Sequence, residues 1–322
     1  MNLDEKDRKI LFALDEDAFQ SLASLSRVTG LSKQVIHYRM LDLQQKGVLR
    51  RCCVIVNTAK LGLSFFKFYL KYKNVGKQLE KEIIDYFDSN DHVGLVDTCD
   101  GKYDMYIGIW AKDTHQLYQI YKSLFKDYGK FFEEITVSIV ETAFNSKRGY
   151  LIGKYTSSEV PLFGGEISSI EIDETDKKIL GLLSKDARMK LVELAKILKI
   201  TPNAVSYRIK QLKLKGIIQG ARIVLDRNKF GYLTYKILVK IDLFDEKEVQ
   251  RFIHYLIQHP NIIDIDLCMG EWNVELDVEI ESYQAFHELM IQLRTEFTKL
   301  IKNYDSLLLF AEHTYSYYPL RK

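Results

Sequence analysis

Apolar residues near the N-terminus recur every three or four positions, which is the spacing of one face of a helix. The pattern predicts a helix over residues 4–14 and a second, shorter helix over residues 22–28. Gly30 then marks a tight turn, and Ser32 is a suitable N-cap for a third helix that ends before Gly47. Three helices with a glycine-containing turn before the third are typical of a helix-turn-helix domain.

Beyond the third helix the pattern changes to short strands that alternate with helices. Residues 48–57 are expected to form a strand of a wing, and the residues after them show the βαββαβ order of a ferredoxin-like domain. One face of that sheet lies under the helices, and the apolar content of the other face predicts that it packs against a second sheet. The expected strands are 65–72, 93–99, 105–110 and 135–142, and the expected helices are 79–87 and 115–125.

The whole pattern occurs twice in the chain. Residues 3–11 match residues 172–180 at an offset of 169 positions, and the same offset still relates Cys99 to Cys268. A constant offset without a gap indicates a tandem duplication. The expected fold class is therefore α+β, a tandem repeat of a winged helix-turn-helix (three-helix) domain followed by a ferredoxin-like domain. The expected boundaries are 1–60 and 170–229 for the two helix-turn-helix heads, 61–145 and 230–322 for the two ferredoxin-like domains, and 146–169 for a linker.

Composition argues against a membrane-spanning protein, a metal-binding protein and an enzyme. The chain has 322 residues, 47% of them hydrophobic, and no run of about 18 apolar residues that would predict a membrane span. The four cysteines form no metal-binding spacing, and Cys52 and Cys53 are expected on opposite faces of a strand as reduced thiols. With no catalytic triad or phosphate-binding loop either, we expect a cytoplasmic protein that is not an enzyme and holds no metal or cofactor.

Charge is concentrated in two equivalent places, although the net charge of the chain is only +2. Residues 31–51 carry five positive side chains against one negative, and residues 199–229 carry eight against one. A charged helix face is ordinarily just solvated. Within a duplicated helix-turn-helix, however, such a concentration favours contact with a phosphate backbone.

Several motifs together resemble one known family. They are LDEKDRKIL and LSKQVIHYRMLDLQQKGVL in the first head, KLG after the strand that follows it, and CDGKYD in the ferredoxin-like domain. This combination resembles the leucine-responsive regulator/AsnC (Lrp/AsnC) family of transcription regulators, whose ferredoxin-like domains are called RAM domains. The resemblance implies an intra-chain pseudo-dimer that pairs through its regulatory sheets and binds double-stranded DNA, with further homo-oligomerisation left open. Because the two heads have diverged, the DNA target is expected to be less symmetric than a palindrome.

By the same resemblance, the third helix of each head enters the major groove of DNA. Gln34 and Asn203 can each pair with adenine through two hydrogen bonds. Arg39 and Arg208 have two readings, contact with DNA or ion pairs with Asp7 and Asp176. The other candidate DNA-binding residues are Ser32, Lys33, His37 and Tyr38 in the first head, Thr201, Ser206, Tyr207 and Lys210 in the second, and Arg50, Arg51 and Arg222 over phosphates at the wings.

The resemblance also implies an effector pocket at the hairpin after the second ferredoxin-like strand. In the family this loop helps to bind an amino acid between subunits. Here the loop contains Asp100, Gly101, Tyr103 and Asp104, and backbone amides near Gly101 would hold a carboxylate while Asp104 would hold an ammonium. The second copy has Asn273 in place of Asp104, which lacks the charge. The alternative is that both loops are simple turns between strands.

Two other functions compete with DNA-binding regulation. Siroheme decarboxylases of heme biosynthesis resemble the same architecture, but the stretches 63–70 and 232–239, where they carry a histidine, contain none here. The other possibility is a regulatory or assembly protein whose heads no longer bind DNA. Two features allow the loss of DNA binding in one head. The heads have diverged, and in the second head Lys199 replaces the turn glycine at a cost of about 1 kcal/mol if the backbone needs a positive φ. The concentration of positive charge in residues 199–229 argues against such a loss in the second head.

Overall fold

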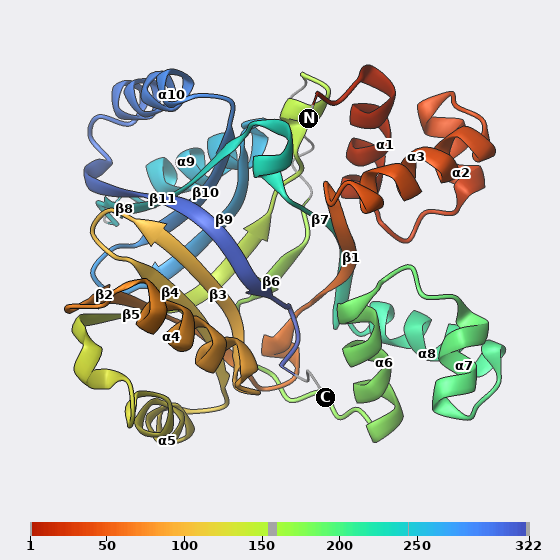
Figure 1. Cartoon of the computed structure of the whole chain (residues 1–322), viewed down its shortest axis with the longest axis horizontal. Coiled ribbons are helices and arrows are strands. Elements are labelled where there is room, and N and C mark those ends of the chain that lie inside the picture. Colours follow the sequence, from red (N-terminus) through yellow and green to blue (C-terminus); the bar gives the residue numbers. More distant parts are fainter. Residues whose placement is uncertain (1, 154–159, 244, 320–322) are drawn as a thin grey trace.

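A computed structural model describes residues 2–153, 160–243 and 245–319. Figure 1 shows two lobes, one made of the two helical heads and the other of the two regulatory domains. A pair of long strands lies between the lobes. Among the described residues, no helix is long and apolar enough to cross a membrane.

The two heads confirm the predicted three-helix pattern. In the first head the N-cap side chains of Asp4, Ser21 and Ser32 each accept a hydrogen bond from a backbone amide of the first helical turn, as such caps do. Leu25 and Ile36 are fully buried in its core. The helices of the first head are α1 (Glu5–Glu16), α2 (Leu22–Thr29) and α3 (Lys33–Gln45), and those of the second are α6 (Glu174–Lys185), α7 (Leu191–Leu198) and α8 (Pro202–Leu214).

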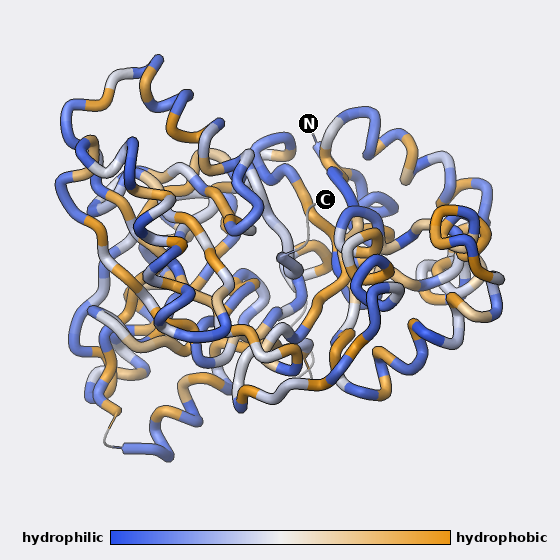
Figure 2. Tube along the Cα trace, turned by 90° about the horizontal axis from the view of Figure 1, so that it is seen from below, coloured by the Kyte–Doolittle hydropathy of each residue, from blue (hydrophilic) through white to orange (hydrophobic). Residues whose placement is uncertain are grey.

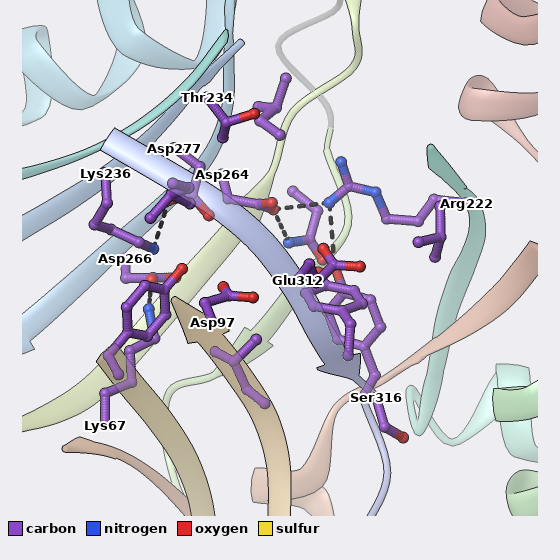
Figure 3. Close-up of a pocket in the computed structure, with 18 of the residues that line it drawn as sticks. Lys67, Asp97, Arg222, Thr234, Lys236, Asp264, Asp266, Asp277, Glu312 and Ser316 are labelled. Carbon is purple, nitrogen blue, oxygen red and sulfur yellow. Dashed lines mark hydrogen bonds and ion pairs between the residues drawn. The ribbon is translucent and has the colours of Figure 1, made fainter. Parts of the chain in front are cut away.

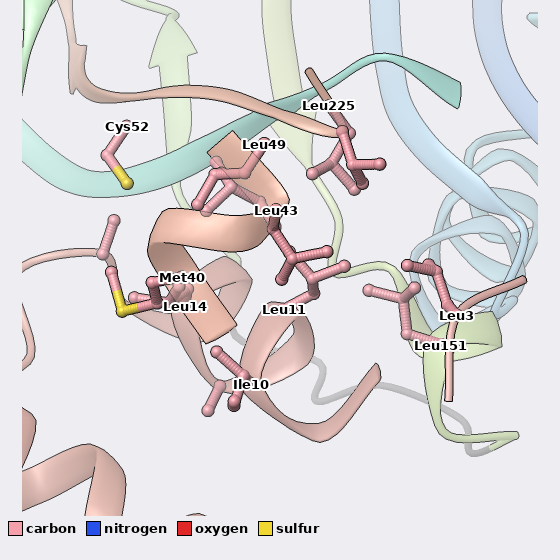
Figure 4. Close-up of a cluster of buried hydrophobic side chains, with 14 of the residues drawn as sticks. Leu3, Ile10, Leu11, Leu14, Met40, Leu43, Leu49, Cys52, Leu151 and Leu225 are labelled. Carbon is pink, nitrogen blue, oxygen red and sulfur yellow. The ribbon is translucent and has the colours of Figure 1, made fainter. Parts of the chain in front are cut away.

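The strands after the heads form, but each pairs with its counterpart in the other copy and not within its own unit. β1 (Leu49–Val56) runs antiparallel to β7 (Ile218–Leu225), with Cys53 opposite Arg222. Figure 4 shows that Leu225 of β7 and Leu151 of the linker lie in the same hydrophobic cluster as the helices of the first head. The core of the first head is therefore completed by residues from outside it.

The regulatory lobe has the predicted βαββαβ order in both copies. Short 3-10 helices lie at Thr58–Lys60, Gly129–Phe131, Gly149–Leu151 and Arg227–Phe230. The first copy consists of β2 (Ser64–Tyr72), α4 (Lys77–Ser89), β3 (Val93–Asp100), β4 (Met105–Ala111), α5 (Thr114–Phe125) and β5 (Phe132–Asn145), with β6 (Leu162–Gly164) contributed by the linker. The second copy consists of β8 (Leu233–Ile241), α9 (Glu246–Gln258), β9 (Ile262–Met269), β10 (Val274–Ile280), α10 (Tyr283–Glu296) and β11 (Ile301–Tyr315).

The two regulatory sheets join at both of their edges. The first sheet has the strand order β5-β2-β4-β3 and the second has β11-β8-β10-β9. β3 pairs with β11, and β5 pairs with β9, so the two sheets close into one barrel. This confirms the expectation that each sheet packs against that of the sibling copy.

Alternate residues of each strand face the helices or the inside of the barrel. On β2, Phe66 and Phe68 belong to the core beneath α4 and α5, whereas Phe65 and Tyr69 belong to the cluster between the two sheets. Figure 2 shows hydrophobic and hydrophilic residues alternating along the helices that cover the barrel. The inner faces of both sheets therefore enclose a lumen.

All four cysteines are buried and unpaired. Cys52 belongs to the core of the first head, and Cys53 belongs to the cluster between the sheets. The predicted opposite orientation of these two neighbours on one strand is confirmed.

Lys199 meets the condition on which its expected cost depends, because its φ is 56°, close to the 71° of Gly30 in the first head. Because glycine has no Cβ, Lys199→Gly should raise the free energy of unfolding by about 1 kcal/mol. The matched exchange Gly30→Lys should lower it by a similar amount, since nothing crowds a Cβ at that position and the backbone alone decides. Urea denaturation of both variants measures this, and equal effects of the same sign would contradict it.

Candidate nucleic-acid interface and internal cavity

The third helix of each head exposes most of the side chains that the sequence predicted to contact DNA. Tyr38 is 71% exposed and Tyr207, at the equivalent position, is 64% exposed, although both are large aromatic residues. Ser32 and Thr201 are the N-caps of these helices, so their hydroxyls are engaged by backbone amides. The other exposed candidates are Lys33, Gln34 and His37 on α3, and Asn203, Ser206 and Lys210 on α8.

Arg39 and Arg208 make the ion pairs that the sequence left as an alternative. Arg39 Nη1 lies 2.7 Å from Asp7 Oδ1, and Arg208 Nη1 lies 2.8 Å from Asp176 Oδ1. Each arginine also pairs with the N-cap aspartate of the first helix of its head. The two residues therefore brace the third helix against the first.

The arginines predicted at the wings are engaged within the protein. Arg222 is only 3% exposed and its Nη1 lies 2.8 Å from Asp264 Oδ1, so the prediction that it sits over phosphates is wrong. It turns inward because β7 pairs with β1 and forms no exposed hairpin. Arg51 donates hydrogen bonds to carbonyl oxygens of Ser184 and Tyr315. Arg50 stays exposed while its Nη1 lies 3.1 Å from Glu312 Oε1.

The two heads also contact each other directly. Arg188 Nη1, from the loop between α6 and α7, donates to the carbonyl oxygens of Ala18 at 2.7 Å and Gln20 at 2.8 Å. The ammonium of Lys213 on α8 lies 3.9 Å from the ring centroid of Phe19. These contacts hold the third helices of the two heads, α3 and α8, in a defined relation.

The hairpin predicted to bind an effector is tightly connected to its surroundings. The carboxylate of Asp104 accepts hydrogen bonds from Lys71 Nζ at 3.0 Å and from the backbone amide of Tyr72 at 2.7 Å. Asn273 plays the same part in the second copy, since its Oδ1 accepts from the amide of Ile241. Tyr103 is fully buried, and its hydroxyl lies 2.9 Å from Thr136 Oγ1.

The turn before these residues packs against the other copy. Gly101 has a φ of 138°, and a Cβ added to it would lie 2.9 Å from the carbonyl oxygen of Ser306 on β11. Asp100, next to it, is exposed. The turn at Gly101 is therefore also a contact between the copies.

The lumen of the barrel contains a cavity of about 60 Å³ with many charged side chains around it. The two sheets contribute different chemistry to it. On β4, the residues of the first copy that face inward are Tyr106, Gly108 and Trp110. The equivalent positions on β10 of the second copy carry Glu275, Asp277 and Glu279. Figure 3 shows Lys67, Lys236, Asp97, Asp266 and Asp277 converging on this region from several strands.

Ion pairs across the lumen satisfy most of these charges. Lys67 pairs with Asp266 and, at 2.6 Å, with Glu275 Oε2. Lys236 Nζ lies 2.5 Å from Asp277 Oδ1. Because buried charges are costly unless paired, each lysine lies beside a carboxylate of the second copy.

Arg148 of the linker extends this network toward the first head. Its guanidinium contacts Asp15 Oδ1 of α1 at 2.6 Å and Glu279 Oε2 of β10 at 2.9 Å. All three residues are buried. One linker side chain thus connects a helix of the first head to the lumen of the barrel.

Asp97 differs from Asp266 and Asp277 of the lumen, because no ion pair in the described part of the chain involves it. It is 5% exposed, and its Oδ1 has no hydrogen-bond partner among the described residues. Burial raises the pKa of Asp97 to about 8, helped by the negative charge of Glu312. Trp110 Nε1 and Arg222 Nη2 also line the cavity as donors without a partner in the described part of the chain.

A second, wider cavity of about 320 Å³ adjoins the first. Asn228 and Phe310 line it, and Phe310 is 53% exposed. Both cavities are lined by Asp97, Thr234, Arg227, Leu309 and Glu312. We call this second cavity the mouth of the lumen. Within the described ranges, no group of three or more His, Cys, Asp or Glu residues is placed to hold a metal ion.

The chain is similar in sequence to winged helix-turn-helix proteins. A family model described as winged helix-turn-helix DNA-binding matches residues 3–50 and 172–219. The transcriptional regulator FL11 of Pyrococcus abyssi is 34% identical over 125 residues, which are 36% of this chain and 76% of that protein. The regulatory protein AsnC of Haemophilus influenzae is 28% identical over 119 residues, which are 37% of this chain and 79% of that protein.

One solved structure is similar over almost the whole chain. The siroheme decarboxylase NirDL aligns with 99% of this chain and 95% of its own at a TM-score of 0.63. The sequence identity is 12%, so this similarity establishes the tandem fold and not the activity.

The unpaired carboxyl of Asp97 predicts a pH-dependent stability. The folded chain binds this proton more tightly than the unfolded chain, whose pKa is the ordinary 3.8, so stability is lost as the pH rises from about 4 to about 8. Asparagine cannot ionise, so the stability of Asp97→Asn relative to the wild type should increase across that window and level off above it. Urea denaturation at several pH values measures the difference, with exposed Asp100→Asn as the control. A difference that does not change with pH would contradict the prediction.

Proposed function

The chain belongs to the Lrp/AsnC family of helix-turn-helix proteins, and we propose that it is a sequence-specific DNA-binding regulator of transcription. The observation that carries the proposal is the pair of exposed recognition helices, each with a tyrosine, an amide side chain and a lysine at its surface. Both helices are firmly braced by the ion pairs of Arg39 and Arg208. Both belong to heads that contact each other, so the chain presents two reading surfaces at once.

The first turns of α3 and α8 would do the reading in the major groove. Gln34 and Asn203 occupy equivalent exposed positions, and each amide can pair with adenine. Lys33 and Lys210 would contact guanine or phosphate. Another pair of equivalent positions differs, with His37 in the first head and Ser206 in the second. We therefore expect an operator with two unlike half-sites.

The family resemblance implies an amino-acid effector at the hairpin. To bind it there, the protein would have to exchange the ammonium of Lys71 for the ammonium of the ligand. Asp104 already holds the ammonium of Lys71. A ligand ammonium would have to replace Lys71 there, and the freed lysine would change contacts at the end of β2. Asn273 holds no such lysine in the described part of the chain, since its Oδ1 accepts a hydrogen bond from the backbone amide of Ile241.

The alternative activity is a siroheme decarboxylase, favoured by the similarity of fold over the whole chain. The lumen weighs against it on two grounds. A cavity of about 60 Å³ holds a few water molecules and not a macrocycle. No histidine is among the residues that line the cavity.

A siroheme titration separates the two functions. We expect the absorption spectrum of siroheme to stay unchanged when the purified protein is added at micromolar concentration. A saturable shift of its main absorption band, followed by release of carbon dioxide, would establish the enzyme instead.

Two variants in the second head test the DNA-binding proposal. Asn203→Ala should cost about 1–3 kcal/mol of binding free energy on the preferred site and relax selectivity at one position. Lys210→Ala should weaken binding to all sequences alike if it contacts phosphate, and reduce the slope of log K against log salt by about 1. Lys126→Ala, an exposed lysine after α5 in the regulatory lobe, is the matched control. Equal effects of Lys126→Ala and Lys210→Ala would overturn the proposed interface.

A further inference from the structure

We propose that the lumen of the barrel is a binding site for a small molecule that carries an ammonium group, with the carboxylate of Asp97 as its anchor. The proposal concerns a site separate from the hairpin at Asp100–Asp104. Binding at this site does not depend on whether the heads bind DNA. Only its regulatory consequence rests on the proposed function.

The duplication explains why Asp97 has no cation. Asp97 and Asp266 are equivalent residues, as are Lys236 and Lys67. Asp266 pairs with Lys67 of the other copy, so the symmetric partner of Asp97 would be Lys236. Lys236 instead pairs with Asp277, and the first copy has Gly108 at that position. The extra carboxylate on β10 takes the lysine and leaves Asp97 without one.

The groups that face Asp97 favour a cation beside it. Glu312 on β11 and Asp277 on β10 add negative charge, Arg227 adds positive charge, and the hydroxyl of Tyr106 on β4 is a hydrogen-bond donor. Lys236 on β8 also lies in this region, but its charge is matched by Asp277. The charges of Glu312 and Asp277 are thus matched by those of Arg227 and Lys236. An ionised Asp97 would be left without a cation of its own, which suits a ligand ammonium.

The surroundings indicate an organic cation. The walls near Asp97 include the rings of Phe65, Tyr106 and Trp110 together with Leu95 and Leu309, which suit an ammonium on an aliphatic stem. The cavity of about 60 Å³ limits the part inside the barrel to a few heavy atoms. A longer molecule would extend into the mouth.

Two unpartnered donors suggest what the rest of the ligand contains. Arg222 Nη2 and Trp110 Nε1 are buried and have no acceptor among the described residues. A hydroxyl or carbonyl oxygen on the ligand would satisfy either one. The site therefore fits a short amine, with or without an acceptor group a few bonds away.

Residues that line both cavities give a ligand access to Asp97, and two ion pairs connect this region to the heads. Asp97 and Glu312 line the mouth as well as the lumen, so a ligand can reach Asp97 from the side of Phe310. Glu312 also pairs with Arg50 of β1, and Arg148 connects the lumen with Asp15 of α1. A bound cation thus lies beside the groups that connect the barrel to the heads.

Calorimetric titration of the full chain tests the site. The probes are ethylamine, 1,4-diaminobutane, ethanolamine and L-alanine, with ethanol as the uncharged control. We expect at least one amine to bind saturably and ethanol not to bind. Because Asp97 is mainly protonated at neutral pH, binding of an ammonium should release a proton, so the measured heat should vary with the ionisation enthalpy of the buffer.

Four variants assign the binding to its residue. Asp97→Asn should weaken amine binding by more than tenfold and abolish the proton release. Asp277→Asn leaves Asp97 intact but frees Lys236 to pair with it, so it should also weaken binding by more than tenfold. Asp85→Asn, at an exposed position on α4, should bind like the wild type. Asp100→Asn, in the exposed turn of the hairpin, reports whether the amine binds there instead. Thermal unfolding of each variant confirms that it folds.

Several results would overturn the proposal. They are the failure of every amine to bind the wild type, unchanged binding by folded Asp97→Asn, or binding lost in Asp100→Asn and kept in Asp97→Asn, which would move the site to the hairpin. Addition of the bound amine to a DNA-binding assay then measures separately whether amine binding changes the affinity for DNA. Amine binding without DNA binding would contradict the proposed function alone.

Discussion

Pairing of backbone edges between the two copies is the constraint on which the rest of the structure depends. β3 pairs with β11, β5 with β9, and β1 with β7, so these edges of the regulatory sheets and of the strands after the heads are completed by the other copy. Unpaired backbone groups at a buried edge are costly. A single copy would expose these edges together with the inner face of its sheet. The folded unit is therefore the pair.

Covalent duplication lets the two halves of this pair differ. In a homodimer every residue of one inner face meets the same set of residues on the other, so a change appears twice. Here the inner face of β10 carries three carboxylates where β4 carries Tyr106, Gly108 and Trp110. One such change, Asp277 in place of glycine, leaves Asp97 without the lysine that symmetry would supply. The same freedom lets the exposed residues of the third helices differ, as His37 and Ser206 do.

The sequence predicted those features that depend on local chemistry or on the repeat. The helix caps, the βαββαβ order and the pairing of sibling sheets are in this class. It did not reveal which face of a charged strand is buried. Apolar and acidic residues alternate over residues 274–280, which is typical of a strand with one face in water. In the structure α9 and α10 cover the apolar side of this strand, and its carboxylates face the lumen. Arg222 was misplaced for a related reason, because its strand pairs across the copies.

The most direct test of the central claim is a footprint of the wild-type chain on genomic fragments that it selects at physiological salt. Two heads held together in one chain should protect a single region that contains two half-sites of unlike sequence. Saturable protection of such a region, with affinity that falls steeply as salt rises, is the predicted result. Equal affinity for every fragment, or no protection at low salt, would contradict the account.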